Sequence, residues 1–217
     1  DAFAVESHAR AANAQAHGWF TDQILPVEVK GRKGTAVVAA DEHVRAGATM
    51  DDMAKLRPVF DREGSVTAGN ASGINDGAAA VVLMSERAAA EQGKTPMARI
   101  IGYAHAGVEP DVMGLGPIPA VTKLLKKTGL SVSDFDVIES NEAFAAQACA
   151  VARELGFPAD KTNPNGGAVA LGHPVGATGA IITVKTLYEL KRTGGTRGLM
   201  TMCIGGGQGI ALAIEIV

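Results

Sequence analysis

The sequence has few cysteines, few aromatic residues and no long hydrophobic run. Its two cysteines lack CxxC spacing and are too sparse for the disulfide framework of a secreted protein, and the five histidines include no HExxH-like pair. Apolar runs such as 78–84 are far shorter than the roughly 18 residues that a membrane span needs. We therefore expect neither a metal site nor a membrane partner.

Runs of one charge sign are also missing. The 20 basic and 23 acidic residues give a net charge of −3, and no five like charges follow one another, which excludes the electrostatic footprint of nucleic-acid binding. The opening residues have no basic segment of the signal-peptide kind, so we expect a cytoplasmic protein. The chain begins without Met and directly with an amphipathic pattern, which we interpret as the middle of a longer polypeptide.

Glycine is the residue in excess. There are 27 glycines, where an average usage of roughly 7% would give about 15. Glycine allows positive φ and close approach of the backbone to a ligand. Hydrophobic residues make up 47% and charged residues 20%, as in compact globular proteins. At roughly 150 residues per domain, the 217 residues correspond to about one and a half domains.

Hydrophobic spacing divides the chain into two parts, with the boundary expected at 91–96. Before it we expect an N-terminal helix with Val5, Ala9, Ala12, Ala16 and Trp19 or Phe20 on one apolar stripe. We further expect an extended segment at 24–29, loops over 30–61, a glycine-punctuated turn at 67–77, a buried run at 78–84, and a helix capped by Ser85 and ended by Gly93.

After the boundary, strands and helices alternate, which indicates a layered α/β architecture. The expected elements are a strand at 99–103, a helix from Pro117 to Gly129, a strand at 136–140, a helix from Asn141 to Gly156, a glycine-rich loop at 166–179, a helix at 180–192 stopped by Gly194-Gly195, and strands at 199–202 and 210–217.

Three polar residues share one architectural position. Asn141 and Cys203 each follow a predicted strand, and His173 lies in the glycine-rich loop before a helix, where open α/β sheets assemble ligand sites. Each residue also has a plain structural explanation: Asn141 as a helix N-cap, His173 as a loop histidine and Cys203 as a core residue. Taken together, they favour a functional site.

The glycine-rich loops do not fit the nucleotide-binding templates. The run 167–172 has P-loop spacing, but His173-Pro174 stands where Lys and Ser or Thr are required. The turn 203–209 lacks the third glycine of a dinucleotide fingerprint, and Ser72 misses the GxSxG elbow by one place. Cys149 lies amid alanines in a predicted helix, so we assign it a structural role, whereas the glycines after Cys203 would expose backbone N–H groups to a substrate.

Three of these segments resemble the active-site blocks of the thiolase family of acetyl-CoA acetyltransferases and β-ketothiolases. They are 141–145, 165–179 and 203–209, and they come in the family's order. The segment 67–77 resembles the family's wall of the pantetheine tunnel. The resemblance implies an α/β fold with layered α/β/α/β/α architecture, in which 1–94 are the remainder of the N-terminal domain with its substrate-covering loops and 95–217 are the C-terminal domain.

The family's acylated cysteine belongs to an N-terminal block that is not matched here. Cys203 matches the acid/base cysteine, and Cys149 matches no family motif. The resemblance therefore implies the C-terminal portion of a thiolase, inactive alone and completed by the missing N-terminal half. It further implies a homo-oligomer (dimer or tetramer), no cofactor apart from coenzyme A thioester as substrate, and a place in fatty acid or polyhydroxyalkanoate metabolism.

The resemblance also assigns roles to residues. His173 would help to activate the absent cysteine and stabilise one oxyanion with a water held by Asn141, Cys203 would exchange the α-proton, and the N–H of Gly205 would complete the second oxyanion hole. Contacts to CoA are implied for Ser72 and Ala68 at the pantetheine amides, Phe60 and Met113 as walls, and Arg45 at the nucleotide end.

Two other functions remain open from the sequence. One is a non-catalytic fragment or structural subunit that binds CoA thioesters. The other is a β-ketoacyl synthase, which the Cys203 block disfavours, because synthases usually place a second His or Asn in these roles.

Overall fold

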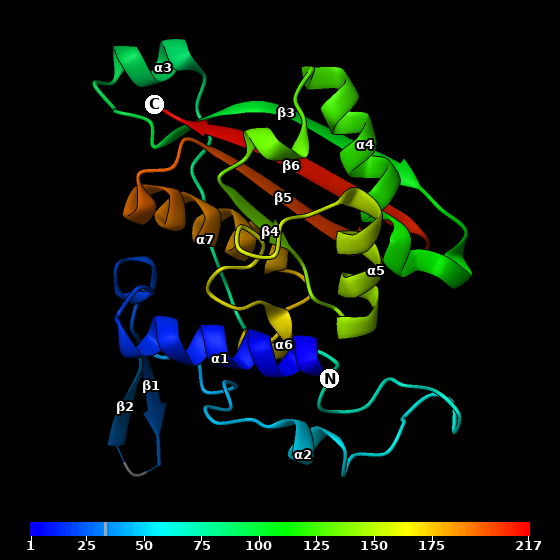
Figure 1. Cartoon of the computed structure of the whole chain (residues 1–217). Coiled ribbons are helices and arrows are strands. Elements are labelled where there is room, and N and C mark those ends of the chain that lie inside the picture. Colours follow the sequence, from blue (N-terminus) through cyan, green and yellow to red (C-terminus); the bar gives the residue numbers. More distant parts are fainter. Residues whose placement is uncertain (33) are drawn as a thin grey trace.

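A four-stranded mixed sheet lies at the centre of the C-terminal part of the molecule (Figure 1). The computed structural model describes residues 1–32 and 34–217. In spatial order the strands are β3 (Ala98–Gly107), β6 (Gln208–Ile216), β5 (Arg197–Ile204) and β4 (Val137–Ser140). β4 runs parallel to β5, and the other two pairs are antiparallel. The predicted strands are confirmed, each somewhat longer or shifted at its ends.

Helices cover both faces of this sheet. Successive strand residues point to opposite faces, and accordingly Leu199 is buried in one apolar cluster and its neighbour Met200 in another. The first cluster packs against α4 (Pro117–Thr128) and α5 (Ala145–Leu155), and the second against α7 (Thr178–Thr193). The layered α/β prediction is therefore confirmed for this part of the chain.

Helix ends follow the predicted glycines. Gly129, Gly156 and Gly194 each take left-handed φ directly after α4, α5 and α7. This conformation lets the last carbonyl groups of a helix find donors without a Cβ clash. The glycine-rich loop before α7 contains one further turn of helix, α6 (Ala168–Leu171), which the sequence analysis missed.

In Figure 1 most of the N-terminal part lies below the sheet, but its last helix, α3 (Glu86–Glu91), lies near the top of the view. α1 (Ala2–Ala16) packs against α6, and β1 (Val27–Gly31) pairs with β2 (Gly34–Val38) in an exposed antiparallel hairpin. The other elements of this part are the 3₁₀ segment η1 (Thr21–Gln23) and the helix α2 (Met50–Met53). The 3₁₀ segments η2 (Pro110–Leu115) and η3 (Val132–Asp134) belong to the C-terminal part, where they precede and follow α4 in the chain. The prediction of loops alone over 30–61 is therefore wrong for β2 and α2.

The apolar stripe predicted for α1 is wrong within the helix, although Phe20, which follows the end of α1, is buried. Val5 and Ala12 are only half-buried and Ala9 and Ala16 are exposed. The buried side chains are instead Ala4, Ser7, His8, Ala11 and Ala14. This face includes polar residues because α1 packs against a loop with buried polar groups rather than against an apolar core, as described below.

The run Ala78–Met84 is extended but exposed, which corrects the expectation of a buried segment. Val82 is 88% exposed and Leu83 75%. Among the described residues, no strand pairs with this segment. An apolar run predicts burial only if a neighbouring element covers it, and the described chain places none there.

A buried ion pair joins α7 to β4. Lys185 Nζ lies 2.7 Å from Glu139 Oε2 and donates a hydrogen bond of 2.6 Å to the carbonyl of Gly166. Burial raises the pKa of Glu139 to about 7, against the opposing pull of the Lys185 ammonium. The lysine therefore holds a strand, a helix and the start of the glycine-rich loop together.

Replacing Lys185 by Met should leave the Glu139 carboxyl buried without its cation. Removing one partner of a buried pair costs about 3–5 kcal/mol, so the urea midpoint of unfolding should fall clearly at unchanged slope. The double variant Glu139→Gln, Lys185→Met should recover part of the loss. Lys191→Met, at an exposed position of the same helix, is the control, and a Lys185→Met variant as stable as this control would contradict the prediction.

Candidate active site

Asn141 directly follows β4, at the edge where β4 and β5 both end. Its backbone N–H donates to the carbonyl of Thr201 over 2.9 Å, which continues the pairing of the two strands. α5 begins only at Ala145, so the interpretation of Asn141 as a helix N-cap and the expected helix start at Asn141 are wrong. The intervening backbone is extended because Phe144 pairs with Ala71 of another segment.

His173 lies in the loop between α6 and α7 and faces Asn141. Asn141 Nδ2 is 3.3 Å from His173 Nε2, and His173 Nδ1 is 2.6 Å from the hydroxyl of Thr178. That hydroxyl also donates to the carbonyl of Pro174 over 2.9 Å. Since the single hydroxyl proton is used there, Thr178 accepts from Nδ1–H, and Nε2 carries the lone pair. Burial lowers the pKa of His173, which favours this neutral form.

Cys203 is the penultimate residue of β5, so it lies inside the strand rather than after it. It is only 7% exposed, and burial raises the pKa of its thiol, so the group is held protonated. Gly209 lies opposite Cys203 in β6 and packs against Gly116, whose carbonyl a Cβ at Gly209 would overlap. Gly205 is exposed in the turn between the two strands.

The other cysteine, Cys149, is exposed on α5. It lies amid alanines in a helix as expected, but its side of α5 faces outward, while Ala148 and Val151 face the core. A structural role in packing is not supported by this position.

The segment 70–72 is brought to the start of α5. Ser72 donates through both its backbone N–H (3.1 Å) and its hydroxyl (2.9 Å) to the carbonyl of Ala143, and the N–H of Ala145 donates to Asn70. Phe60, which is 77% exposed, meets the edge of Phe144 at a centroid distance of 5.9 Å. Two of the residues implied as CoA contacts, Ser72 and Phe60, thus lie against the stretch that follows Asn141.

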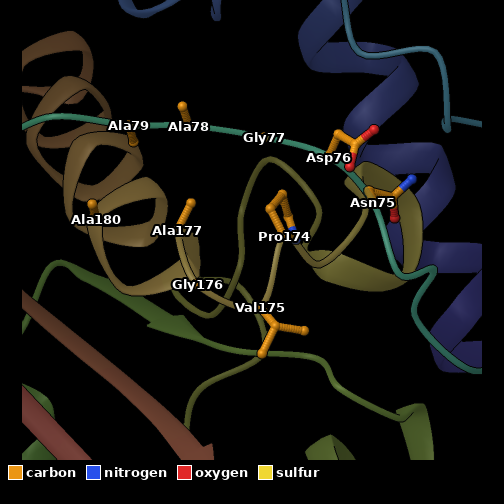
Figure 2. Close-up of a pocket in the computed structure, with 10 residues that line it drawn as sticks. All are labelled: Asn75, Asp76, Gly77, Ala78, Ala79, Pro174, Val175, Gly176, Ala177 and Ala180. Atoms are coloured by element: carbon orange, nitrogen blue, oxygen red, sulfur yellow. The ribbon is translucent and has the colours of Figure 1, made fainter.

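A pocket of about 390 Å³ adjoins the loop that carries His173. Figure 2 shows the extended residues 75–79 crossing the start of α7, with Pro174 and Ala177 between them. Asn75 joins this pocket to the site, because its side-chain oxygen accepts from the N–H of His173 over 3.3 Å. Asn141, His173 and Cys203 themselves do not line the pocket.

The remaining implied contacts are less closely tied to this centre. Arg45 is exposed, and its backbone N–H donates to Nδ1 of the buried His8. Ala68 is exposed in the turn that precedes Asn70. Met113 is half-buried in η2, where the next residue, Gly114, packs directly on Gln147 of α5. The structure brings Asn141 and His173 into direct contact, but it shows no such contact for these three.

Thr178 is a residue that the sequence analysis missed. The signal was present, since Thr178 lies one helical turn after His173-Pro174 and begins α7, but a hydroxyl there reads equally well as a helix-start residue. Within residues 1–32 and 34–217, no group of three potential metal ligands is found. Among the helices in the described ranges, none combines the length and the hydrophobicity of a membrane span.

Comparison with known proteins identifies two matching family models. The model of the thiolase N-terminal domain matches residues 1–87, and that of the thiolase C-terminal domain matches residues 94–216. The β-ketothiolase BktB of Cupriavidus necator is 60% identical over 216 residues, and the acetyl-CoA acetyltransferase of Shinella zoogloeoides is 58% identical over 215 residues. Each alignment covers 99% of this chain and 55% of the relative, so the chain spans about half the length of these curated relatives.

Solved structures show the same fold. The acetyl-CoA acetyltransferase of Bacillus anthracis superimposes with a TM-score of 0.98 at 52% identity, covering 100% of this chain and 55% of that one. Human mitochondrial 3-ketoacyl-CoA thiolase in complex with CoA gives a TM-score of 0.92 at 44% identity, with 100% and 54% covered. The resemblance read from the three sequence blocks is thus confirmed, and the chain belongs to the thiolase family.

Proposed function

We propose that the chain is the C-terminal portion of an acyl-CoA C-acyltransferase of the thiolase type. The reaction is the reversible Claisen condensation of two acyl-CoA molecules, or thiolysis of a 3-ketoacyl-CoA. The observation that carries the proposal is the contact between Asn141 and His173, with the His173 tautomer set by Thr178. In this proposal residues 1–94 are the remainder of the N-terminal domain with its covering loops, and 95–217 are the C-terminal domain.

In the thiolysis direction, a cysteine from outside this chain attacks the 3-keto carbon. The bond between the α- and β-carbons breaks, and its electron pair takes the proton of the Cys203 thiol to give acetyl-CoA. The Cys203 thiolate then takes the proton of a free CoA thiol, whose sulfur attacks the acyl-enzyme. The bond to the enzyme cysteine breaks, the shortened acyl-CoA leaves, and the released enzyme sulfur takes back its proton from the protonated His173. Burial supports the role of Cys203, because a thiol with raised pKa keeps its proton until the carbanion forms.

His173 and Asn141 serve the oxyanion of this reaction. The lone pair of His173 Nε2 can accept a proton from the attacking thiol, and the protonated ring then donates to negatively charged oxygen. The side-chain oxygen of Asn141 is buried and has no partner among the described residues, as expected for an acceptor that holds a water. The exposed N–H of Gly205 supplies the second donor site.

Substrate contacts follow from the segments beside Asn141. The Ser72 hydroxyl uses its proton on Ala143, so its lone pairs are free to accept an N–H of the pantetheine arm. Ala68 offers its exposed backbone nearby, Phe60 and Met113 form apolar walls, and Arg45 is a forked cation for a phosphate. CoA thioester is then the substrate, with no resident cofactor.

The complete protein would include the N-terminal half that carries the nucleophile. We propose a homo-oligomer, a dimer or tetramer, in the cytoplasm, acting in fatty acid or polyhydroxyalkanoate metabolism. These statements rest on membership of the family and on the composition of the chain.

Substituting the proposed proton-transfer residues in the complete enzyme tests the function directly. His173→Ala and Cys203→Ala should each abolish most thiolysis of acetoacetyl-CoA, because residues that act as one unit fail together. Cys149→Ala, which changes an exposed residue on α5, should do little. Mass spectrometry should find an acetyl adduct on a cysteine outside this chain, and circular dichroism checks folding. Unaltered turnover in Cys203→Ala would remove Cys203 from the proton transfer, whereas a complete protein that binds CoA thioesters without turnover would favour the non-catalytic alternative.

Thr178→Val should lower kcat while preserving shape. Loss of the hydroxyl removes the acceptor for His173 Nδ1–H, so we expect a fall of about 10- to 100-fold, part of the roughly 10²–10⁴ that a positioned acid or base supplies. Thr178→Ser keeps the hydroxyl and should stay close to the wild type. Thr183→Val, which removes an exposed hydroxyl hydrogen bond to Gly179 in the same helix, is the matched control. Equal kcat in the Val and Ser variants at position 178 would remove Thr178 from this role.

CoA affinity should depend on Arg45 and Ser72. The double variant Arg45→Ala, Ser72→Ala should bind CoA more weakly and lose salt dependence, because the attraction of Arg to phosphate is screened over about 8 Å at physiological ionic strength. Isothermal titration at two salt concentrations measures both effects, with Arg87→Ala on α3 as control. Unchanged affinity and salt dependence would exclude both residues from the CoA site.

A further inference from the structure

Glu142 is a buried carboxylate to which the proposed reaction assigns no role. It directly follows Asn141 and is 1% exposed. Its Oε2 accepts from the hydroxyl of Ser7 (2.7 Å) and the N–H of Val169 (3.1 Å), and its Oε1 accepts from Asn163 Nδ2 (2.7 Å). Three donors from three separate segments therefore converge on one side chain.

The surroundings of this carboxylate favour an acceptor at both oxygens. Ser7 accepts a hydrogen bond from the N–H of Gly167 over 3.0 Å, which leaves its hydroxyl proton for Glu142. Gly167 packs so closely that a Cβ there would overlap the Glu142 carboxyl group. Burial raises the pKa of Glu142, and the hydrogen bonds from Ser7 and Asn163 oppose that shift. Burying the Glu142 carboxylate is therefore tolerable only if all of its hydrogen-bond donors are in place.

The same carboxylate connects the two segments that form the active site. One segment is the end of β4, with Asn141 next to Glu142. The other is α6 (Ala168–Leu171), which contains Val169. Its C-cap residue, Gly172, directly precedes His173. The Glu142–Val169 bond joins the segments at one end, and the Asn141–His173 contact joins them at the other. A displacement of Val169 relative to Glu142 would therefore move His173 relative to Asn141, because one turn of helix connects Val169 to His173.

We propose that Glu142 is a positioning residue of the acyltransferase, which holds α6 against β4 and so sets the separation of Asn141 and His173. Ser7 of α1 supports it by bridging the carboxylate and Gly167. The inference rests on the proposed function for its effect on rate. At 1% exposure the carboxylate does not touch substrate, so it acts only through Asn141 and His173.

Glu142→Gln in the complete enzyme is the principal test. In one orientation of the glutamine amide its NH₂ group would face the donor Asn163 Nδ2, and in the other it would face the N–H of Val169. Two donors repel each other, so in either case residue 142 and one of these partners must move apart. Misplacement by about 1 Å costs up to about 10²-fold, and we expect kcat for thiolysis to fall by about 10- to 100-fold with KM for CoA within about twofold. Glu91→Gln, on the exposed surface of α3, is the matched control.

A second readout separates positioning from simple stability. In ¹⁵N NMR the His173 ring signals should shift in Glu142→Gln, since Nε2 loses its fixed neighbour, and the acid limb of kcat/KM against pH should move with them. Ser7→Ala makes the milder change of removing the bridge, and it should give the same shifts with a smaller loss of kcat. Ser133→Ala, at an exposed site, is its control.

Each outcome decides the matter. A lower melting temperature with unchanged kcat and unchanged His173 signals would show a structural role only and overturn the proposal. If Glu142→Gln does not fold, Ser7→Ala is judged by the same criteria. If the wild-type enzyme performs no thiolysis, the proposed function fails, while the His173 signals of the variants still confirm or overturn the positioning role independently.

Discussion

The site depends on the parallel pairing of β4 with β5. Because Ser140 lies opposite Thr201 and the N–H of Asn141 donates to the same Thr201, the two strands finish at one edge, with Asn141 at the end of one and Cys203 near the end of the other. The side chain of Asn163 then mimics a further strand by bonding both backbone groups of Ser140. From this edge the chain continues through α5 and α6 to His173, so the strand register sets the positions of Asn141 and Cys203, and the loop after α6 brings His173 to Asn141.

Burial gives the two titratable groups of the site complementary properties. It lowers the pKa of His173 and raises that of Cys203, so both are neutral near pH 7, one as an acceptor whose Nε2 lone pair faces the Asn141 amide and the other as a donor with its proton. Neutral groups are less costly to bury than charged ones. The buried charges of the region are set further back, where Lys185 faces Glu139 and hydrogen-bond donors surround Glu142.

The features that depend on neighbouring residues in the sequence could be predicted from it. The alternation of strands and helices, the helix ends at Gly129, Gly156 and Gly194, and the shared site of Asn141 and His173 could be read from spacing and turn residues. The start of α5 could not, because Phe144 is held extended by pairing with Ala71, far away in sequence. The polar face of α1 was missed for a related reason. Ser7 is buried because Glu142 and Gly167 need its hydroxyl, and hydrophobic periodicity carries no signal for such a partner.

The meeting of Gly116 and Gly209 has an evolutionary consequence. The two backbones touch where a Cβ on either residue would overlap the other chain segment. In most pairs of packed residues, a larger side chain at one position can be accommodated by a smaller one at the other, so the two positions can change together. Here both residues are already the smallest available, and no compensating substitution exists. A larger residue at either position must therefore be accompanied by a backbone shift beside Cys203. We expect such substitutions to be selected against at both positions.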